Sequence, residues 1–549
     1  MNRAKRSLTA LVVASLFAIP STASAADPPE AVGFDVYFSS GDAITKLHAK
    51  VLRPRHLAMN VRTPVVMTVS PYFNQNDLVS PTETGEQRFV DDFIGESKLL
   101  QRGYTYVMVD LPGFGGSGGC NDWGGDREQS AVTRAVEWAA GQPWSNGRVA
   151  LLGKSYDAWT GLMGIARQPK GLVAVVAMEP VYSGYKYLYM NGVRFGNSIT
   201  TPLIFQGLDL QPGDPMRPPD YQLNGAPQFW CYGVNFALQQ QDSEEVSFWR
   251  GRDLLPATKG KQTPVFLTQG FLENNTRQDA AFDFFNGVTG PKRAWFGQFA
   301  HVRGWQREDG RYLAGRPGFM AEVIRFLDRH VRGRSTRSEP PVLVQDNLGR
   351  YRAERRWPPP DSRVIRNELN SGSYTDDGQN QGTGAAGGKG LWTFSQPLAY
   401  DAWFSGEPVL KASVDSALPR ANLVANVYDV EEDGVAVLIS RGATLLRGSG
   451  GQDASIKLYG QDWLIRKGHR IGVLLSSANA EWWLHVPTGA DVAVSSAEIA
   501  MSFLTHKRTK FAGGRPTPKL EEHVGTGFPV PEPTIEEGTR RFKLPRPLD

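Results

Sequence analysis

One serine in the chain lies where a strand, a sharp turn and a helix follow one another directly. Val149 to Leu152 is an apolar run that predicts a buried strand, and Tyr156 to Arg167 has the pattern of a helix. Ser155 stands in the turn between them, two residues after Gly153. Such a turn holds its central residue in a strained conformation that exposes the hydroxyl, and the helix N-terminus behind it stabilises negative charge. The pattern predicts that Ser155 is a nucleophile for a carbonyl carbon.

A second serine matches the same kind of motif more literally. The segment Gly115 to Gly119 reads Gly-Gly-Ser-Gly-Gly around Ser117, whereas Asp157 stands where the motif at Ser155 would have its second glycine. Ser117, however, belongs to a glycine-rich loop with no helix directly behind it. We therefore predict that Ser117 is a loop residue beside the site and that Ser155 is the nucleophile.

A serine hydroxyl needs a histidine to accept its proton and a carboxylate to orient that histidine. Of the eight histidines, His301 follows a predicted strand, Arg293 to Phe299, in a loop downstream of the serine. His330 lies off the apolar stripe of a predicted helix, near the helix end. His301 is therefore the predicted general base.

The acid is expected between the serine and the histidine in the chain. Val265 to Gln269 predicts another buried strand, and Glu273 follows it in a loop, where a carboxylate is well placed to orient an imidazole. Asp279 is the alternative, although it falls within a predicted helix, Arg277 to Phe285. We predict that Glu273 is the acid and keep Asp279 open.

Taken together, these motifs resemble the cocaine-esterase and X-prolyl dipeptidyl-peptidase group of α/β-hydrolase serine hydrolases. The group has a Gly-x-Ser-Tyr elbow, like Gly153 to Tyr156, and a Ser-Pro-Tyr motif, like Ser70 to Tyr72. The resemblance implies that the Tyr72 hydroxyl and the backbone N–H of Tyr156 stabilise the oxyanion. The other matching segments are residues 110–117, 142–145, 270–273 and 299–301.

Two positions depart from the pattern of this group. Ala158 stands where glycine is usual, a small change that the tight turn could absorb. Glu273 stands where aspartate is commoner, which keeps the charge but lengthens the side chain. The assignment of the acid therefore depends on a longer carboxylate reaching the histidine.

The chain divides into two patterns of secondary structure. From residue 26 to 335, apolar runs alternate with helical stretches, which predicts a mostly parallel sheet; the resemblance makes it an α/β-hydrolase catalytic domain. Aromatic residues scattered from about 182 to 262 indicate a helical cap insertion over the site. From 342 to 549, short β-rich runs alternate with glycine and proline turns and end in a proline-rich tail. This part is predicted to be an antiparallel β-sandwich, which the resemblance makes a jelly-roll domain.

Residues 1 to 25 have the features of a secretory signal peptide. A basic start precedes an apolar stretch, Leu8 to Ile19, that is too short to span a bilayer, and Ala23 to Ala25 supplies a small-residue cleavage site. We expect a secreted or periplasmic protein that is cleaved near Ala25 and has no membrane anchor in the mature chain. The formal net charge of +4 over 549 residues gives no indication of nucleic-acid binding.

These features predict a secreted serine hydrolase that cleaves an ester or amide bond through an acyl-enzyme on Ser155. The chemistry needs no cofactor, and no paired Cys/His spacing indicates a metal site. The expected partner is a small ester or amide or a short peptide, and the oligomeric state stays open. One alternative is an X-prolyl dipeptidyl-peptidase, which would need an acidic anchor for the substrate amine that the sequence does not identify. Another is a non-catalytic binding protein on the same fold.

The two cysteines, Cys120 and Cys231, are expected to form a disulfide in an exported chain. The bond would tie the predicted cap to the glycine-rich loop and close a loop of about 110 residues, for which chain-entropy estimates give about 4–5 kcal/mol. Mass spectrometry of the non-reduced, alkylated mature protein should therefore show no alkylation. Two alkylated thiols would mean that both cysteines are free and buried as small apolar residues, which is the alternative.

Overall fold

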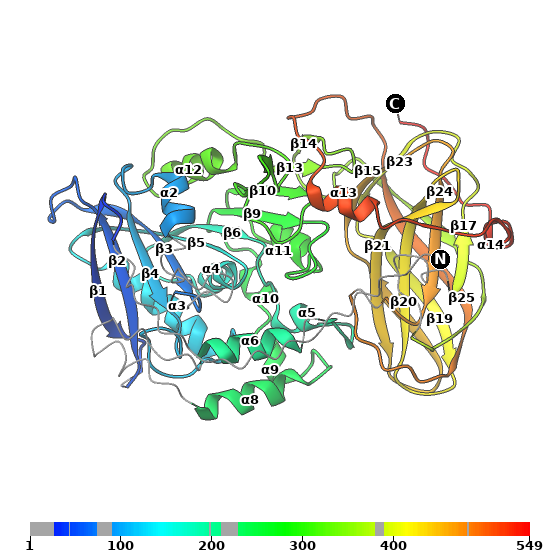
Figure 1. The fold of residues 1–549 in the computed structure, drawn as a ribbon, viewed down its shortest axis with the longest axis horizontal. Coiled ribbons are helices and arrows are strands. Elements are labelled where there is room, and N and C mark those ends of the chain that lie inside the picture. The colour runs from blue at the N-terminus through cyan, green and yellow to red at the C-terminus, as the bar shows by residue number, and fades with distance from the viewer. Residues whose placement is uncertain are drawn as a thin grey trace, which may run out of the picture.

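The computed structural model describes residues 27–42, 44–73, 90–196, 199–209, 229–378, 389–479 and 482–548. An α/β part and an all-β part lie side by side (Figure 1). The predicted signal peptide falls outside the described residues. Within the described ranges, no helix combines the length and the apolar character that crossing a lipid bilayer requires.

The α/β part is built on one ten-stranded sheet. From β4 to β13 in sheet order, neighbouring strands run parallel, whereas β1, β2 and β14 are antiparallel to their neighbours. This confirms the predicted mostly parallel sheet. In sheet order the strands are β1 (Ala31–Ser39), β2 (Lys46–Pro54), β4 (Thr105–Asp110), β3 (Thr63–Ser70), β5 (Ser145–Lys154), β6 (Leu172–Met178), β9 (Val265–Gly270), β10 (Lys292–Gly297), β13 (Val342–Gln345) and β14 (Tyr351–Glu354).

Helices cover both faces of this sheet, so its central strands are largely apolar and buried on both sides. The helices of the two faces belong to two separate apolar clusters with the strands between them. One face has η1 (Val90–Ile94), α2 (Gly95–Ser97) and α12 (Phe319–His330); the other has α3 (Asp126–Ala140), α4 (Tyr156–Arg167) and α11 (Ala281–Gly287).

A group of short helices is inserted between β6 and β9. They lie together along the lower side of the α/β part in Figure 1 and fill the stretch where the sequence predicts a helical cap. Aromatic residues of the insertion such as Tyr185, Phe205 and Trp249 join the apolar core of the α/β part, whereas Phe195 packs with Trp482 and Trp483 of the all-β part. The elements are α5 (Gly184–Leu188), β7 (Tyr189–Met190), β8 (Val193–Arg194), α6 (Thr200–Asp209), α8 (Phe229–Gln239), α9 (Ser247–Arg250) and α10 (Leu255–Thr258).

The boundary between the two parts differs from the prediction. The sequence places the second domain from residue 342, but β13 pairs in parallel with β10, and β14 pairs with β13. Both strands therefore belong to the first sheet, and the α/β part extends to the end of β14 rather than stopping before residue 342. A short apolar run does not reveal its hydrogen-bonding partner, because strand pairing is decided by contacts that are distant in sequence. A small hairpin, β11 (Arg307–Glu308) and β12 (Arg311–Tyr312), lies between β10 and α12 in the chain.

The second part is an antiparallel β-sandwich, as predicted, with its apolar core between two sheets. One sheet has β22 (Gly450–Lys457), β19 (Val409–Ser416), β25 (Asp491–Leu504), β18 (Ala402–Gly406) and β23 (Gln461–Ile465), with β15 (Ser362–Glu368) and β16 (Gly372–Thr375) paired to β25. The other has β17 (Leu391–Phe394), β24 (Arg470–Ser476), β20 (Ala421–Val430), β21 (Val435–Leu446) and β26 (Phe528–Pro529).

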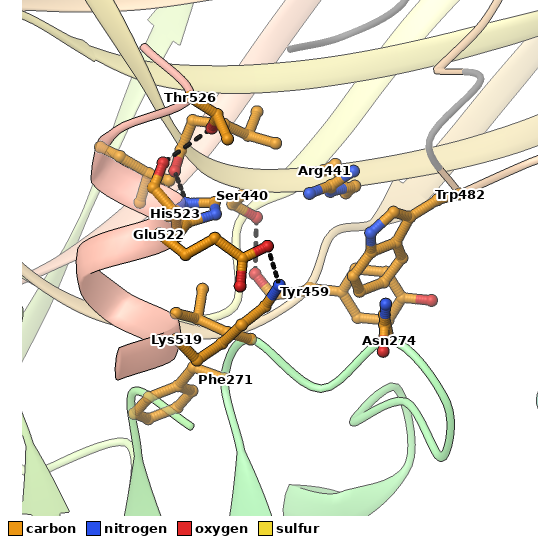
Figure 2. A pocket seen from close by; sticks show the side chains of 13 residues that line it. Phe271, Asn274, Ser440, Arg441, Tyr459, Trp482, Lys519, Glu522, His523 and Thr526 are labelled. Atoms are coloured by element: carbon orange, nitrogen blue, oxygen red, sulfur yellow. Dashed lines mark hydrogen bonds and ion pairs between the residues drawn. The ribbon is translucent and has the colours of Figure 1, made fainter. Parts of the chain in front are cut away.

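The proline-rich tail wraps back onto the molecule. Its strand β26 pairs with β21, and α14 (Glu532–Gly538) packs on β17. Its other helix, α13 (Pro518–Val524), lies between the two parts (Figure 1). The side chains of Lys519 and Glu522 on this helix lie above Phe271 of the α/β part (Figure 2). The tail is thus part of the junction.

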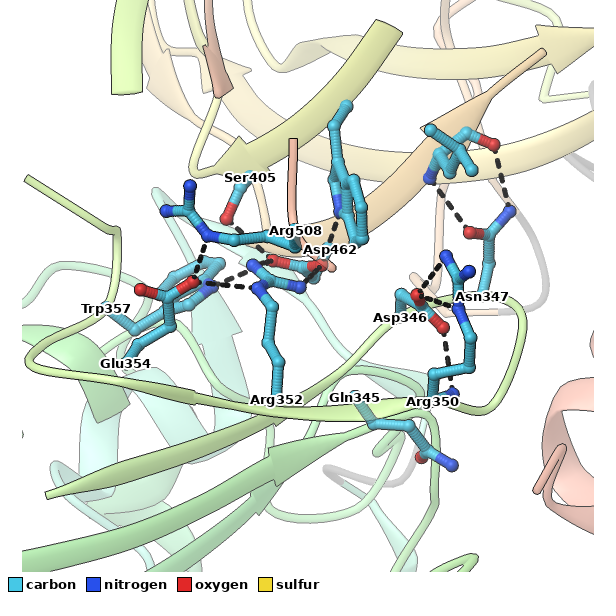
Figure 3. A network of polar contacts seen from close by, with 12 residues as sticks. Gln345, Asp346, Asn347, Arg350, Arg352, Glu354, Trp357, Ser405, Asp462 and Arg508 are labelled. Carbon is cyan, nitrogen blue, oxygen red and sulfur yellow. Dashed lines mark hydrogen bonds and ion pairs between the residues drawn. The ribbon is translucent and has the colours of Figure 1, made fainter. Parts of the chain in front are cut away.

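A buried ion pair joins the two parts (Figure 3). Both terminal nitrogens of Arg352, in β14, donate to the Asp462 carboxylate in β23, at 2.6 and 2.7 Å. The exposed fractions of the two side chains are 1% and 0%. Asp462 also accepts from Trp403 Nε1 at 2.8 Å and Ser405 Oγ at 2.6 Å. Arg352 Nε also donates to Glu354 Oε1 at 2.8 Å, whereas the buried charge of Asp462 depends on Arg352 for compensation.

We expect Arg352→Met to lower the stability of the protein strongly. The substitution keeps most of the side-chain volume but leaves Asp462 buried without its counter-charge, a loss of about 3–5 kcal/mol. Thermal unfolding followed by circular dichroism measures the effect. Arg311→Met is the matched control because Arg311 and Glu521 form a largely exposed pair, with exposed fractions of 46% and 53%. Equal midpoints for the two variants would show that the Arg352 pair does not anchor the parts.

Candidate active site

The backbone at Ser155 has the strained turn that the sequence predicts. Ser155 joins β5 to α4 with φ 65° and ψ −124°, a positive φ that is rare outside glycine. Its N–H donates to the Met178 carbonyl of the next strand at 2.9 Å. Gly153 lets the chain close this turn, because a Cβ there would lie 2.4 Å from the Asp157 carbonyl carbon. Ala158 is the third residue of α4, where a Cβ is ordinary.

Glu273 and His301 follow the two neighbouring strands β9 and β10. The His301 Nδ1 lies 2.8 Å from Glu273 Oε2, so the longer carboxylate reaches the imidazole. The Glu273 side chain is completely buried, and its other oxygen accepts from the backbone N–H of Asn275 at 2.5 Å and of Thr276 at 3.2 Å. The loop therefore holds the carboxylate in place and leaves one oxygen for the histidine.

Lys154, the residue before Ser155, connects the serine turn to the loop of His301. Lys154 Nζ donates to the His301 backbone carbonyl at 3.1 Å, so the end of β5 and the histidine loop are in direct contact. The parallel strands β5, β6, β9 and β10 are neighbours in the sheet, and their carboxyl ends lie at one edge. The structure thus places Ser155, Glu273 and His301 at the same edge. Their catalytic roles stay a prediction.

Burial governs the protonation of this region. It lowers the pKa of His301 below its ordinary value, against the opposing effect of the Glu273 carboxylate. It also lowers the pKa of Lys154 to about 8. A histidine with a lowered pKa is neutral at neutral pH, which is the form that can accept a proton.

A second buried carboxylate, Glu179, lies beneath the acid loop. It follows β6 directly and accepts from Thr268 Oγ1 at 3.1 Å, Gln269 Nε2 at 3.1 Å and the Gly270 N–H at 3.0 Å. Its backbone carbonyl accepts from Thr276 Oγ1 at 2.7 Å. Burial, and then the charge of Glu273, raise the pKa of Glu179 well above its ordinary value. Sequence analysis missed Glu179, although its place just after a buried strand is the same signal that identified Glu273.

The alternative residues lie elsewhere. Asp279 precedes α11, which begins at Ala281 rather than at Arg277 as predicted, and it lines a separate small cavity with Lys186. Ser117 is buried, donates to the Asp110 carbonyl at 2.7 Å and accepts from the His48 N–H at 2.8 Å. These bonds give the Ser117 hydroxyl a structural role in the glycine-rich loop.

The two tyrosines predicted to stabilise an oxyanion pack against one cap residue. The Phe205 ring, in α6, lies 6.0 Å from the Tyr72 ring and 4.7 Å from the Tyr156 ring, between centroids. Tyr156 is the first residue of α4, so its N–H has no partner within the helix. The Tyr156 hydroxyl donates to Glu128 Oε2 at 2.6 Å, which fixes the residue. Burial, and then Asp122, raise the pKa of Glu128 to about 8.

The disulfide stays a prediction. Cys120 lies at the end of the glycine-rich loop, and Cys231 lies in α8. The side chain of Cys231 is outside the described residues, so the structure does not test the pairing.

Family models match most of the chain. Residues 41–303 match the X-Pro dipeptidyl-peptidase (S15 family) model, and residues 335–517 match the X-Pro dipeptidyl-peptidase C-terminal non-catalytic domain. The chain belongs to the X-Pro dipeptidyl-peptidase and cocaine-esterase group of serine hydrolases. In this group the α/β part is the catalytic domain, and the β-sandwich is the C-terminal domain.

Individual members of the group are distant from this chain. A Streptomyces avermitilis protein, provisionally named an Xaa-Pro dipeptidyl-peptidase, is 25% identical over 452 residues, which cover 72% of this chain and 63% of that protein. A Mycobacterium bovis protein, provisionally named a serine esterase, is 23% identical over 384 residues, covering 56% and 58%. The structure of a CocE/NonD family hydrolase from Staphylococcus aureus matches with TM-score 0.66 at 14% identity, covering 86% of this chain and 94% of that one. This structural likeness shows the shared fold.

We expect Glu273→Gln to lower kcat by up to about 10⁴-fold, because the amide keeps the shape but loses the charge that stabilises the imidazolium. Asp279→Asn is the matched control, since it makes the same change at the other candidate acid and should leave kcat almost unchanged. Steady-state kinetics on a p-nitrophenyl ester measures both variants. A severe loss in Asp279→Asn with a mild one in Glu273→Gln would reassign the acid.

Proposed function

We propose that the protein hydrolyses an ester or amide bond through an acyl-enzyme on Ser155. The observation that carries the proposal is the combination of a strained serine at the start of α4 with a Glu273–His301 pair at the same sheet edge. A binding protein would have no use for this strain, because it costs about 1–3 kcal/mol and serves to present a reactive hydroxyl.

In the proposed mechanism, His301 accepts the proton of the Ser155 hydroxyl as the oxygen attacks the substrate carbonyl. Glu273 holds the Nδ1–H of the imidazole and stabilises the imidazolium that forms. The Tyr72 hydroxyl and the Tyr156 N–H donate to the oxyanion of the tetrahedral intermediate. His301 then gives this proton to the leaving group. In the second half of the reaction His301 accepts a proton from a water molecule as its oxygen attacks the acyl carbon, and gives that proton to Ser155 Oγ as the carboxylic acid is released.

Ester or simple acyl substrates rank ahead of X-Pro dipeptides. A dipeptidyl-peptidase must bind the free amine of its substrate, usually through a carboxylate. Among the buried carboxylates around the site, Glu128, Glu179 and Glu273 each accept hydrogen bonds from protein donors, so these three are engaged within the protein. X-Pro dipeptidyl-peptidase activity remains the second candidate because both family models carry that description.

We also propose export, on the basis of the signal-peptide pattern in residues 1 to 25.

The proposal predicts that a fluorophosphonate probe labels the wild-type protein once, at Ser155. Ser155→Ala should not be labelled and should lose about 10⁶-fold in turnover, as in other triads. Ser117→Ala is the matched control and should keep its labelling and most of its activity. Intact-mass spectrometry and assays on short p-nitrophenyl esters beside an Ala-Pro p-nitroanilide check these outcomes. Labelling of Ser155→Ala but not of Ser117→Ala would move the nucleophile to Ser117, and faster cleavage of the anilide would favour the peptidase.

A further inference from the structure

The C-terminal domain reaches the loop that carries His301. Gln298 lies three residues before the histidine, and its side chain is completely buried. Its Nε2 donates to Gln461 Oε1 at 2.6 Å and to the Asp462 backbone carbonyl at 3.1 Å, and both residues belong to β23 of the sandwich. The histidine loop is thus bonded across the junction between the domains.

The backbone of Gln298 is held by Gln345 and by the C-terminal tail. Its N–H donates to Gln345 Oε1 at 3.0 Å, and Gln345 Nε2 in turn donates to the Arg515 carbonyl of the tail at 2.9 Å. Its carbonyl accepts from Thr517 Oγ1, the hydroxyl that also caps α13. Buried polar groups that lose a partner are costly, so these bonds resist movement of the loop.

This contact also involves the residue that forms the buried ion pair between the domains. Asp462, whose backbone carbonyl accepts from Gln298, is the carboxylate that pairs with Arg352 (Figure 3). Gln461 Oε1 accepts from the Asp462 N–H at 2.9 Å as well as from Gln298. Gln461, which binds the side chain of Gln298, is therefore bonded to Asp462. Asp462 cannot move without breaking its buried ion pair with Arg352.

The acid loop is enclosed by the same domain. Phe271 and Asn274, on either side of Glu273, line a cavity of about 40 Å³ together with Tyr459 and Trp482 of the sandwich and with α13 (Figure 2). Leu272 belongs to the apolar cluster of the sandwich. Both loops that supply the acid and the base therefore depend on contacts from the C-terminal domain.

We propose that Gln298 is a positioning residue through which the C-terminal domain fixes the loop of His301 against Glu273. This inference rests on the triad of the proposed function. It gives the C-terminal domain a specific task in catalysis, which is to hold the acid and base geometry rather than to bind substrate. A shift of about 1 Å in such a loop is enough to lower turnover about 100-fold.

The test uses Gln298→Met in the full chain, which keeps the side-chain volume and removes the donors. We expect kcat to fall about 10- to 100-fold with KM unchanged, and the rate of fluorophosphonate labelling to fall by the same factor. The charged groups that face His301 are Glu273, Lys154 and Arg303. Glu273 raises the pKa of His301, so a looser contact should move the acid limb of the kcat/KM profile to lower pH.

Gln461→Met tests the same bond from the other domain and keeps Gln298 in place. It should produce a smaller change in the same direction, and the double variant should lose less than the product of the two single losses. Arg420→Gln is the matched control. It breaks an exposed interdomain ion pair with Asp242 at 2.9 Å and touches neither loop, so its kcat should stay unchanged.

Active-site titration with the probe separates positioning from misfolding. A loss of kcat that merely follows the fraction of titratable sites, or an unchanged kcat and acid limb in both methionine variants, would overturn the inference alone. If the wild-type protein does not react with the probe, the proposed function fails and the inference fails with it.

Discussion

The site depends on one backbone conformation, the positive φ of Ser155. Such a conformation costs about 1–3 kcal/mol in a non-glycine residue, so the surroundings must hold it. The Met178 carbonyl binds the Ser155 N–H, and Gly153 permits the close approach of the Asp157 backbone. Because the turn ends β5, it lies between β3, which leads to Tyr72, and the strands that lead to the acid and base. Tyr72, Glu273 and His301 reach the site because the strands that precede them lie on either side of β5 in the sheet.

Gathering these groups at one buried edge creates a problem of charge. Two carboxylates, Glu179 and Glu273, lie near one imidazole, and a second ionised carboxylate would raise the pKa of His301 and keep it protonated. Burial and the charge of Glu273 instead raise the pKa of Glu179, which favours its neutral form. Glu273 is then left as the negative charge beside the proposed base, His301. Lys154, whose pKa burial lowers, adds little positive charge at alkaline pH.

The part of the site that was predictable from sequence is the part built by local structure. A buried strand, a glycine, a serine and a helix follow one another within the chain, so the bounds of α4 match the predicted Tyr156–Arg167. The missed residues, Glu179 and Gln298, are buried polar side chains whose partners come from other strands and from the other domain. The place of Glu179 just after a buried strand is a local signal, but no local periodicity reveals the distant partners of either residue. The assignment of β13 and β14 failed for the same reason, since their place in the sheet depends on β10.

The sheet order explains why the contacts of the second domain described above reach the loops of Glu273 and His301 rather than the turn at Ser155. The strands β9, β10, β13 and β14 form the edge that faces the sandwich, whereas β3 and β5 lie toward the middle of the sheet. The proposed nucleophile, Ser155, and the two tyrosines are held by the sheet, helices and cap of the catalytic domain. The loops after β9 and β10 lie at the junction, and beside their bonds within the catalytic domain they also take partners from the sandwich and its tail. A disturbance of the junction should thus misalign the acid and the base first, while the strained serine keeps its conformation.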